Sequence, residues 1–477
     1  MISKPEASQP CLSRVRPLAG AIAAMFLLSG SLAAHAADGD SVKDLERRLE
    51  QSLKVIEALT ARVGQLETQS SKVAPAAAPS DNRVSALEQS VASLSESLSK
   101  RSSDTGLPVH GFLDVSFGSQ TSTDLKNYPA SMQKTGLRGF NAGTLDFYLT
   151  PQFGNRVKTL VELAFEYDDA GSVAPDLERA QIGYSLSDNN TVWFGRFHTP
   201  YGYWNTGFHH GAQLQTALSR PRFIDFEDKG GMLPAHSVGA WFTGKTSAGS
   251  GRVTYDLYMT NGNRIMAGDN DKVLNLNGFT DDNHKKAIGF NLGYEWASGL
   301  KVGMHGLRDT VSAYDGTDAD TSSVLNTSKV NMLGGYAFYD NNNWELLGEY
   351  YHWNNTTEAG QNPAGIIGTL GSHSSNAWFA QAGYTLGSQW TPYARYEKAS
   401  LDTNDVFFNS LNNGRSYKRA TFGLRYNVDP RSAVKVELSH TTEGEGRQMN
   451  NNAGVTTTDV FGKSSYSLFQ AQYAIGF

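Results

Sequence analysis

Cysteine is almost absent from this chain of 477 residues, since Cys11 is the only one. It lies inside a segment, residues 1–36, that has the pattern of a cleaved leader. The mature chain is therefore expected to contain no thiol. This excludes disulfides, thiolate metal sites and cysteine nucleophiles, and a chain without thiols is common in an oxidising compartment.

Long apolar runs and an excess of positive charge are also missing. No window after the leader approaches the roughly eighteen consecutive apolar residues of a membrane-spanning helix. The chain has 41 basic and 47 acidic residues, a formal net charge of −6, so nothing points to a nucleic-acid partner. Hydrophobic content is only 39%, although the chain has 48 glycines, 21 tyrosines and 23 phenylalanines.

The leader, residues 1–36, shows the three parts of a secretory signal peptide. Lys4, Arg14 and Arg16 supply the positive start, and an apolar stretch of 18–28 follows. Small residues at 34–36 complete a cleavage site before Ala37. The sequence therefore predicts export from the cytoplasm.

Residues 37–106 are predicted to form a periplasmic coiled coil with a Pro/Ala linker at 72–80. Apolar residues recur in heptad spacing before and after this linker, at Val42, Leu45, Leu49, Ile56, Leu59, Val63, Leu66, Val84, Leu87, Val91, Leu94 and Leu98. The seam has nothing else in the chain to pack against, so pairing with copies of itself is expected. A solitary amphipathic helix lying on the barrel or on the membrane is the alternative.

From residue 107 to the carboxyl terminus, the pattern changes to segments of about ten residues with alternating polarity. In the last one, Phe469, Tyr473 and Phe477 share one face, and Gln470 and Gln472 share the other. Such alternation, with an aromatic terminal residue, is typical of a transmembrane β-barrel. About sixteen strands are predicted, near 108–118, 143–153, 157–168, 176–187, 190–198, 236–246, 251–260, 286–296, 300–309, 329–340, 343–353, 375–386, 389–399, 416–428, 432–441 and 463–477.

The connections between these strands favour an all-β transmembrane antiparallel barrel over a soluble sandwich. Short turns alternate with long polar stretches, such as 119–142, 261–285, 310–328, 354–374 and 442–462. Membrane barrels have short periplasmic turns and long external loops, whereas a sandwich has no reason to place every long loop at one end.

In this pattern the chain resembles the sixteen-stranded trimeric porins of Gram-negative bacteria, over roughly residues 107–477. With its helical stem it is similar to the DcaP-like porins, and more distantly to the phosphate-selective porins O and P. The resemblance implies a homotrimer in the outer membrane with the amino-terminal segment in the periplasm. It also implies that the longest connection, 199–235, folds inward after the fifth strand and narrows the pore.

Charged residues of this loop and of the inward strand faces are the candidate pore-lining groups. Fixed charges of this kind select ions at close range. The candidates for the constriction or for facing the solute are Arg196, His198, Arg220, Arg222, Asp225, Glu227, Asp228, Lys229, Arg395 and Arg425. The alternative is that the arginines only form salt bridges that fasten the loop to acidic wall residues, among them Glu345, Glu349, Glu397 and Glu437.

No metal site or cofactor is predicted. His198, His209, His210 and His236 are a possible set of ligands, but no motif determines their spacing.

The expected function is passive diffusion of small hydrophilic solutes through a water-filled pore, with the loop arginines leaning towards anions. One alternative is a structural tether or adhesin whose helical stem binds peptidoglycan or another periplasmic partner. The other is a barrel enzyme, but His352, His373 and His440 are scattered and have no defensible nucleophile nearby. The chain is therefore not expected to be an enzyme.

Overall fold

The computed structural model describes residues 109–122, 138–167, 173–208, 211–226, 231–265, 274, 276, 285–314, 323–341, 343–361, 368–411, 414–452 and 455–477. The signal peptide predicted at 1–36, the coiled coil at 37–106 and its linker lie outside the described residues. They stay predictions.

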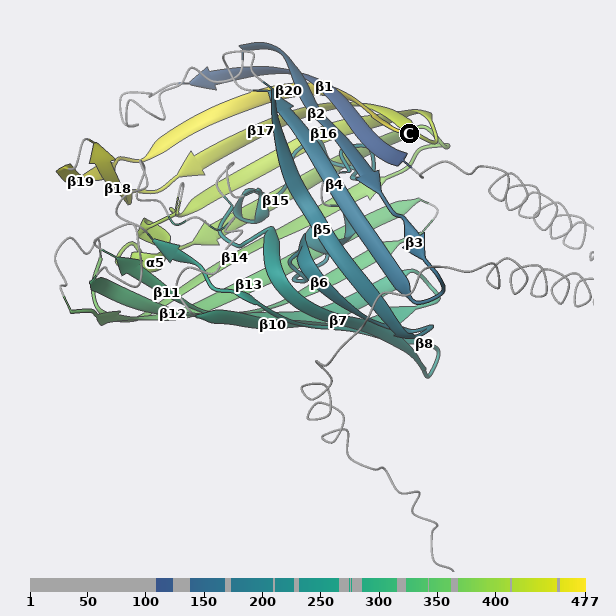
Figure 1. The fold of residues 1–477 in the computed structure, drawn as a ribbon. Coiled ribbons are helices and arrows are strands. Elements are labelled where there is room, and N and C mark those ends of the chain that lie inside the picture. Colours follow the sequence, from purple (N-terminus) through teal and green to yellow (C-terminus); the bar gives the residue numbers. More distant parts are fainter. Residues whose placement is uncertain are drawn as a thin grey trace, which may run out of the picture. The chain divides into compact units, whose positions relative to one another are not determined.

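Sixteen antiparallel strands form a closed barrel (Figure 1). Each wall strand pairs with its neighbours along the chain, and β1 closes the ring by pairing with β20. The wall strands are β1 (Val109–Ser122), β2 (Arg138–Leu149), β4 (Val157–Tyr167), β5 (Val173–Ser187), β6 (Asn190–His198), β7 (His236–Ala248), β8 (Gly251–Asn261), β10 (Lys286–Trp296), β11 (Leu300–Tyr314), β12 (Val324–Asp340), β13 (Trp344–Ala359), β14 (Gly371–Tyr384), β15 (Trp390–Ser400), β16 (Tyr417–Asp429), β17 (Ser432–Glu443) and β20 (Ser464–Gly476).

Four further short strands lie outside this ring. The two-residue strands β3 (Gln152–Phe153) and β9 (Arg264–Ile265) pair with β4 and β11. A separate hairpin is formed by β18 (Gly446–Asn452) and β19 (Val455–Phe461). In Figure 1 this hairpin lies at the end of the barrel away from the carboxyl terminus.

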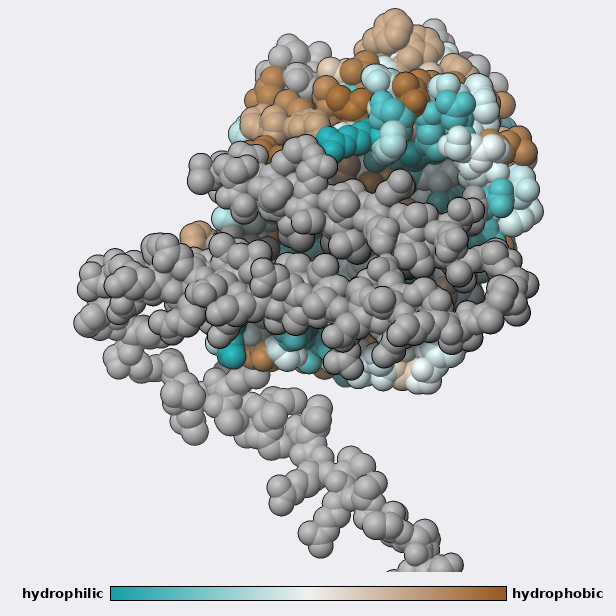
Figure 2. Space-filling model, turned by 90° about the vertical axis from the view of Figure 1, so that its right-hand side faces the viewer, coloured by the Kyte–Doolittle hydropathy of each residue, from teal (hydrophilic) through white to brown (hydrophobic). Residues whose placement is uncertain are grey.

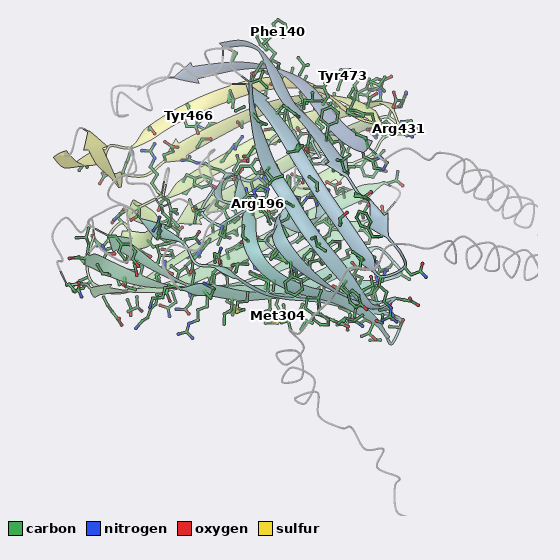
Figure 3. The ribbon with its side chains drawn as sticks, viewed as in Figure 1. Phe140, Arg196, Met304, Arg431, Tyr466 and Tyr473 are labelled. Atoms are coloured by element: carbon green, nitrogen blue, oxygen red, sulfur yellow. The ribbon has the colours of Figure 1, made fainter. Side chains whose placement is uncertain are left out.

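Alternation along the strands places exposed apolar side chains outside. The inward faces carry buried charged groups together with an apolar cluster, which includes Trp353 and Phe379 of the wall and Trp204 of the loop 199–235. Phe422 is 64% exposed, whereas its neighbour Thr421 is fully buried. Met304 projects from the outer wall and Arg196 lies within the barrel (Figure 3). Figure 2 shows patches of hydrophobic residues on the described surface, with hydrophilic residues between them. The barrel thus reverses the arrangement of a water-soluble protein, whose charged groups are mostly exposed.

All sixteen predicted wall strands are present, but several extend further towards the long loops than predicted. The strand predicted at 329–340 begins at Val324, and the one predicted at 343–353 continues to Ala359. The added residues are largely polar and still pair, as the 2.8 Å contact between the hydroxyl groups of Ser328 and Thr357 shows. Backbone pairing needs no apolar face, so alternation underestimates strand length here.

The helices among the described residues are short, namely α4 (Trp204–Gly207), the 3-10 turn η3 (Arg222–Ile224) and α5 (Val406–Asn409). No described helix is both long and apolar enough to cross a membrane.

Candidate functional site

The connection between β6 and β7, residues 199–235, reaches the opposite side of the barrel. Its two ends are joined where the backbone N–H of Thr199 donates to the carbonyl of Ala235 at 2.9 Å. Asn205 donates from Nδ2 to both of these residues' carbonyls, at 2.9 and 3.1 Å. In the ring order β6 is the fifth wall strand and β15 the thirteenth. Bonds from this loop to β15 therefore cross the ring.

The first attachment is at Glu349 of β13. Its Oε1 accepts hydrogen bonds from the backbone N–H groups of Tyr203 and Trp204, at 3.1 and 2.6 Å. Its Oε2 accepts a bond of 2.5 Å from the hydroxyl of Tyr351. Because Trp204 begins α4, the carboxylate satisfies backbone donors at the start of this short turn. The Trp204 side chain is fully buried.

The second attachment joins the middle of the loop to β15 and β17. Oε2 of Glu437 accepts from the backbone N–H groups of Leu218 and Ser219 at 3.1 and 3.2 Å. Arg395 donates to the carbonyl of Ser219 at 2.7 Å, to its hydroxyl at 2.8 Å and to the carbonyl of Arg220 at 3.1 Å. The loop backbone is thus held at Ser219 by an acid and a base from neighbouring parts of the wall.

The third attachment is at Arg222, which is buried. Its backbone N–H donates to Oε2 of Glu397 at 2.7 Å, and its guanidinium pairs with Glu443. The guanidinium also lies 4.7 Å from the ring centroid of Tyr417, whose hydroxyl accepts from the backbone N–H of Phe223 at 3.0 Å. Both backbone and side chain therefore fasten this turn to the wall.

Two basic side chains of the wall donate to loop carbonyl groups. Arg425 of β16 donates to the carbonyls of Gln213 and Gln215, at 2.7 and 2.8 Å. Lys435 of β17 donates to the carbonyls of Ala212 and, at 3.2 Å, of Ala217. These bonds satisfy carbonyl groups of residues 212–217, a segment in which few carbonyls accept from backbone N–H groups.

Arg220 contacts other parts of the loop. Its guanidinium donates to Oδ1 of Asn205 at 3.1 Å and to the carbonyl of Ile224 at 2.8 Å. It lies 3.9 Å from the carboxylate of Asp225 and 4.3 Å from the ring centroid of Phe226. The Asp225 side chain is 23% exposed. The other candidates of this run, Glu227, Asp228 and Lys229, lie outside the described residues.

Arg196, His198 and His236 lie at the base of the loop. Arg196 donates from Nε to the carbonyl of Glu178 at 3.0 Å. His198 and His236 are opposite each other in the β6–β7 register, with ring centroids 5.4 Å apart. His236 is 2.8 Å from the carboxylate of Glu178. In the described part of the chain no group of three or more potential metal ligands comes together, and His209 and His210 lie outside it.

The ten sequence candidates thus divide into three groups. The acidic and basic run of Asp225, Glu227, Asp228 and Lys229 forms one of them, and only Asp225 of this run is among the described residues. The side chains of Arg220, Arg395 and Arg425 donate to loop carbonyls, and that of Arg222 pairs with Glu443 of β17. Arg196 and His198 lie near the base of the loop. Sequence reasoning missed Arg419, which lies 3.7 Å from Glu437 and 3.9 Å from Glu397, although it shares the inward face of Thr421 and Arg425. It also missed Glu443, which falls in the predicted loop 442–462 but ends β17 in the structure. It missed Tyr351 and Tyr417 because a hydroxyl partner leaves no pattern in a sequence.

A second loop, between β15 and β16, contains α5. The side chain of Asp405 accepts from the backbone N–H of Phe407 at 3.0 Å and from Asn355 of β13 at 3.0 Å. Phe408 is fully buried, with its ring centroid 5.5 Å from that of Trp353. This loop is therefore also packed against the inner face of the wall, at the end where the strands reach the long loops.

No family model matches the chain, and no curated protein matches it. Several solved structures have a related fold. The anion-selective porin from Comamonas acidovorans is 13% identical, with 78% of this chain and 99% of that chain covered and a TM-score of 0.49. OmpT of Vibrio cholerae, in its in-vitro folded trimer form, is 13% identical over 77% and 99% of the two chains, with a TM-score of 0.45. Salmonella typhi OmpF in complex with daunomycin is 13% identical over 77% and 97%, also with a TM-score of 0.45.

Proposed function

We propose that this chain is an outer-membrane porin, through which small hydrophilic solutes diffuse passively. The observation that carries the proposal is the reversed arrangement of polarity in a closed sixteen-stranded ring. Apolar outer side chains suit hydrocarbon, and a ring of this size leaves room for water and charged groups inside.

The loop 199–235 is proposed to form the constriction. Its attachments to β13, β15, β16 and β17 support a fixed partition across part of the lumen rather than a mobile flap. In this proposal Arg220, Arg222, Arg395 and Arg425 act at the constriction by holding the loop. Asp225, which keeps some exposure, is proposed to face the solute together with Glu227, Asp228 and Lys229.

Conductance of the purified mature chain in a planar lipid bilayer tests the pore. Discrete conductance steps that scale with salt concentration are expected, and a reconstituted chain that passes no current would overturn the proposal. The reversal potential across a salt gradient then tests charge selectivity. The loop arginines lean towards anions, whereas Asp225, Glu227 and Asp228, proposed to face the solute, lean towards cations. A cation-selective pore would contradict the lean towards anions and leave the pore itself unaffected.

We also propose that residues 1–36 are removed on export, and that residues 37–106 assemble a periplasmic trimer. The heptad spacing supports the second point. The mass of the mature chain tests cleavage before Ala37, and chemical cross-linking in the membrane tests the trimer. Cross-links that stop at dimers would refute it.

A further inference from the structure

Two lysines lie directly opposite each other on the outer face of the barrel. Lys398 of β15 and Lys418 of β16 are register partners, and like charges opposite each other destabilise a sheet. Lys418 is exposed and Lys398 half-buried. Their other register partners are Trp378 for Lys398 and Thr442 for Lys418, so none of the described positions paired with them carries an acid. Among the described residues the two lysines therefore have no register partner of opposite charge.

Both side chains belong to the outward-facing set. Lys418 is followed on the same face by Ala420, Phe422, Leu424, Tyr426 and Val428, and Phe422 and Val428 are 64% and 45% exposed. On β15 the outward neighbour of Lys398 towards the short turns is Tyr396, which is 41% exposed. The outer surface of β15 and β16 is thus apolar along most of its length and becomes basic where Lys398 and Lys418 lie side by side.

The same change of polarity occurs on β17. Leu438 is 54% exposed, and the next outward residue is His440, which is also exposed. The two ring nitrogens of His440 lie 2.9 Å from the hydroxyl of Ser467 and 3.2 Å from that of Ser465. His440 is the register partner of Ala420, one outward position below Lys418. Polar groups therefore continue the basic patch onto β20.

The height of the lysines matches a membrane boundary. Tyr426 packs on Trp390 near the short turns, with ring centroids 4.5 Å apart. A strand rises about 3.4 Å per residue and is tilted by about 40° in a membrane barrel, so Lys418 lies roughly 20 Å further along the membrane normal than Tyr426. The lipid-facing apolar band of such a barrel is about 25 Å tall, which puts Lys418 near its edge if Tyr426 is near the other edge. A second aromatic pair, Trp378 and Tyr396, lies beside Lys398 with centroids 5.6 Å apart. Aromatic girdles of this kind occur at lipid–water interfaces.

We propose that Lys398, Lys418 and His440 bind the phosphate of a phosphorylated lipid in the outer leaflet. The acyl chains of this lipid would lie along the apolar surface that includes Phe422 and Leu438. The lysines stand at the end of the strands that leads to the long loops, which is the external side of a membrane barrel. The inference rests on the proposed outer-membrane location and goes beyond the pore function, because the site lies on the outer wall.

Native mass spectrometry of the detergent-solubilised full chain tests the site, with lipid A as the phosphorylated glycolipid probe. The double variant Lys398→Gln/Lys418→Gln is expected to retain lipid A at least roughly tenfold less than the unchanged chain, since each cation near anionic lipid adds attraction. Lys329→Gln is the matched control. This outward lysine of β12 already pairs with Glu358, so its replacement should leave retention unchanged.

Two further probes distinguish the contribution of the lipid's negative charge from that of its acyl chains. Phosphatidylcholine, whose phosphate is offset by its own cation, should be retained less than lipid A. Inorganic phosphate should not displace lipid A at equal concentration, because it lacks the acyl chains. Equal retention of lipid A by the double variant would overturn the proposal, as would equal retention of phosphatidylcholine or ready displacement by phosphate. Conductance is measured in parallel and is expected to be unchanged in the variants. A chain that binds lipid A but passes no current would refute the pore and not this site.

Discussion

At the residue scale, Glu437 connects the middle of the loop 199–235 to the barrel wall. Its carboxylate accepts from two successive backbone N–H groups of the loop and, at 3.0 Å, from the hydroxyl of Tyr393. Arg419 lies 3.7 Å away and balances its charge. A single buried carboxylate thus couples the loop to three wall strands.

The substitution Glu437→Gln should weaken the attachment of the middle of the loop, at Leu218 and Ser219, to the wall. The amide keeps the volume but puts a donor where an acceptor is needed, and it removes the negative charge beside Arg419. Loss of hydrogen bonds to a charged group should lower the free energy of unfolding by about 2 kcal/mol. The measurement is urea-induced unfolding of the chain refolded in lipid vesicles. The same variant should show larger and noisier conductance steps.

The control for this prediction is Glu358→Gln on the outer surface. Glu358 pairs with Lys329, but both side chains are about half exposed, at 55% and 44%. Exposed pairs of this type contribute at most about 1 kcal/mol. If the two variants lose equal stability, Glu437 does not hold the loop.

At the element scale, the loop 199–235 depends on close contact at Gly202. This glycine has a positive φ of 60°. A Cβ atom built there would lie 2.2 Å from Oε2 of Glu349 and 2.3 Å from the hydroxyl of Tyr351. The loop therefore approaches the wall too closely for any side chain.

Gly202→Ala should displace this end of the loop from β13 and widen the pore. Single-channel conductance is expected to rise, and larger neutral sugars should enter in liposome-swelling assays. Gly154→Ala separates crowding from backbone strain, because Gly154 has a similar φ of 67° but nothing within 4 Å of its Cβ position. Unchanged sugar permeation in Gly202→Ala, or the same increase in Gly154→Ala, would contradict the assigned contact.

The loop between β15 and β16 has a pH-sensitive attachment. Asp402 accepts from the backbone N–H of Asn404 at 2.9 Å and lies 2.9 Å from Nδ1 of His373. These two partners, the backbone bond first, lower the pKa of Asp402 below its ordinary 3.8. Because the pKa of Asp402 is lower in the folded state than in the unfolded state, its carboxylate stabilises the loop fully at pH values above the unfolded-state pKa. This stabilisation is lost as the pH falls through the folded-state pKa.

We therefore expect the amide resonance of Asn404 to titrate below pH 3.8. In His373→Gln the titration should move upward, since one of the groups that favour the charged form is gone. Asp402→Asn should abolish it. A midpoint at or above the ordinary value in the unchanged chain would show that the attachment does not form.

The wall was predictable from the sequence, and the attachments of the loop were not. Alternation on β16 and β20 is local, so a reader of the sequence could identify outward and inward residues without knowing their neighbours. The bond between Leu218 and Glu437 joins residues more than two hundred positions apart, and no local pattern relates them. The arginines of the loop were identified as candidates, but their partners among backbone carbonyls could be known only from the fold.

At the scale of the whole molecule, the barrel wall carries buried charged groups on its inner face and exposed apolar groups on its outer face. Row by row across β16, β17 and β20, Phe422 is paired with Leu438 and Leu438 with Phe469, and all three are exposed. On the adjacent inward row, Glu437 is paired with Gln470. Two neighbouring residues of one strand, Phe469 and Gln470, therefore face opposite environments.

This contrast gives a test that uses the same new side chain at both positions. Phe469→Arg should lower the free energy of unfolding in lipid vesicles by roughly 2–4 kcal/mol, the cost of an arginine near the middle of a bilayer. Gln470→Arg should cost much less, because its guanidinium reaches water and the carboxylate of Glu437. The measurement is equilibrium unfolding in the same vesicles for both variants. In a water-soluble barrel with an apolar interior the order of the two variants would be reversed, and that result would refute the membrane-spanning arrangement of the strands.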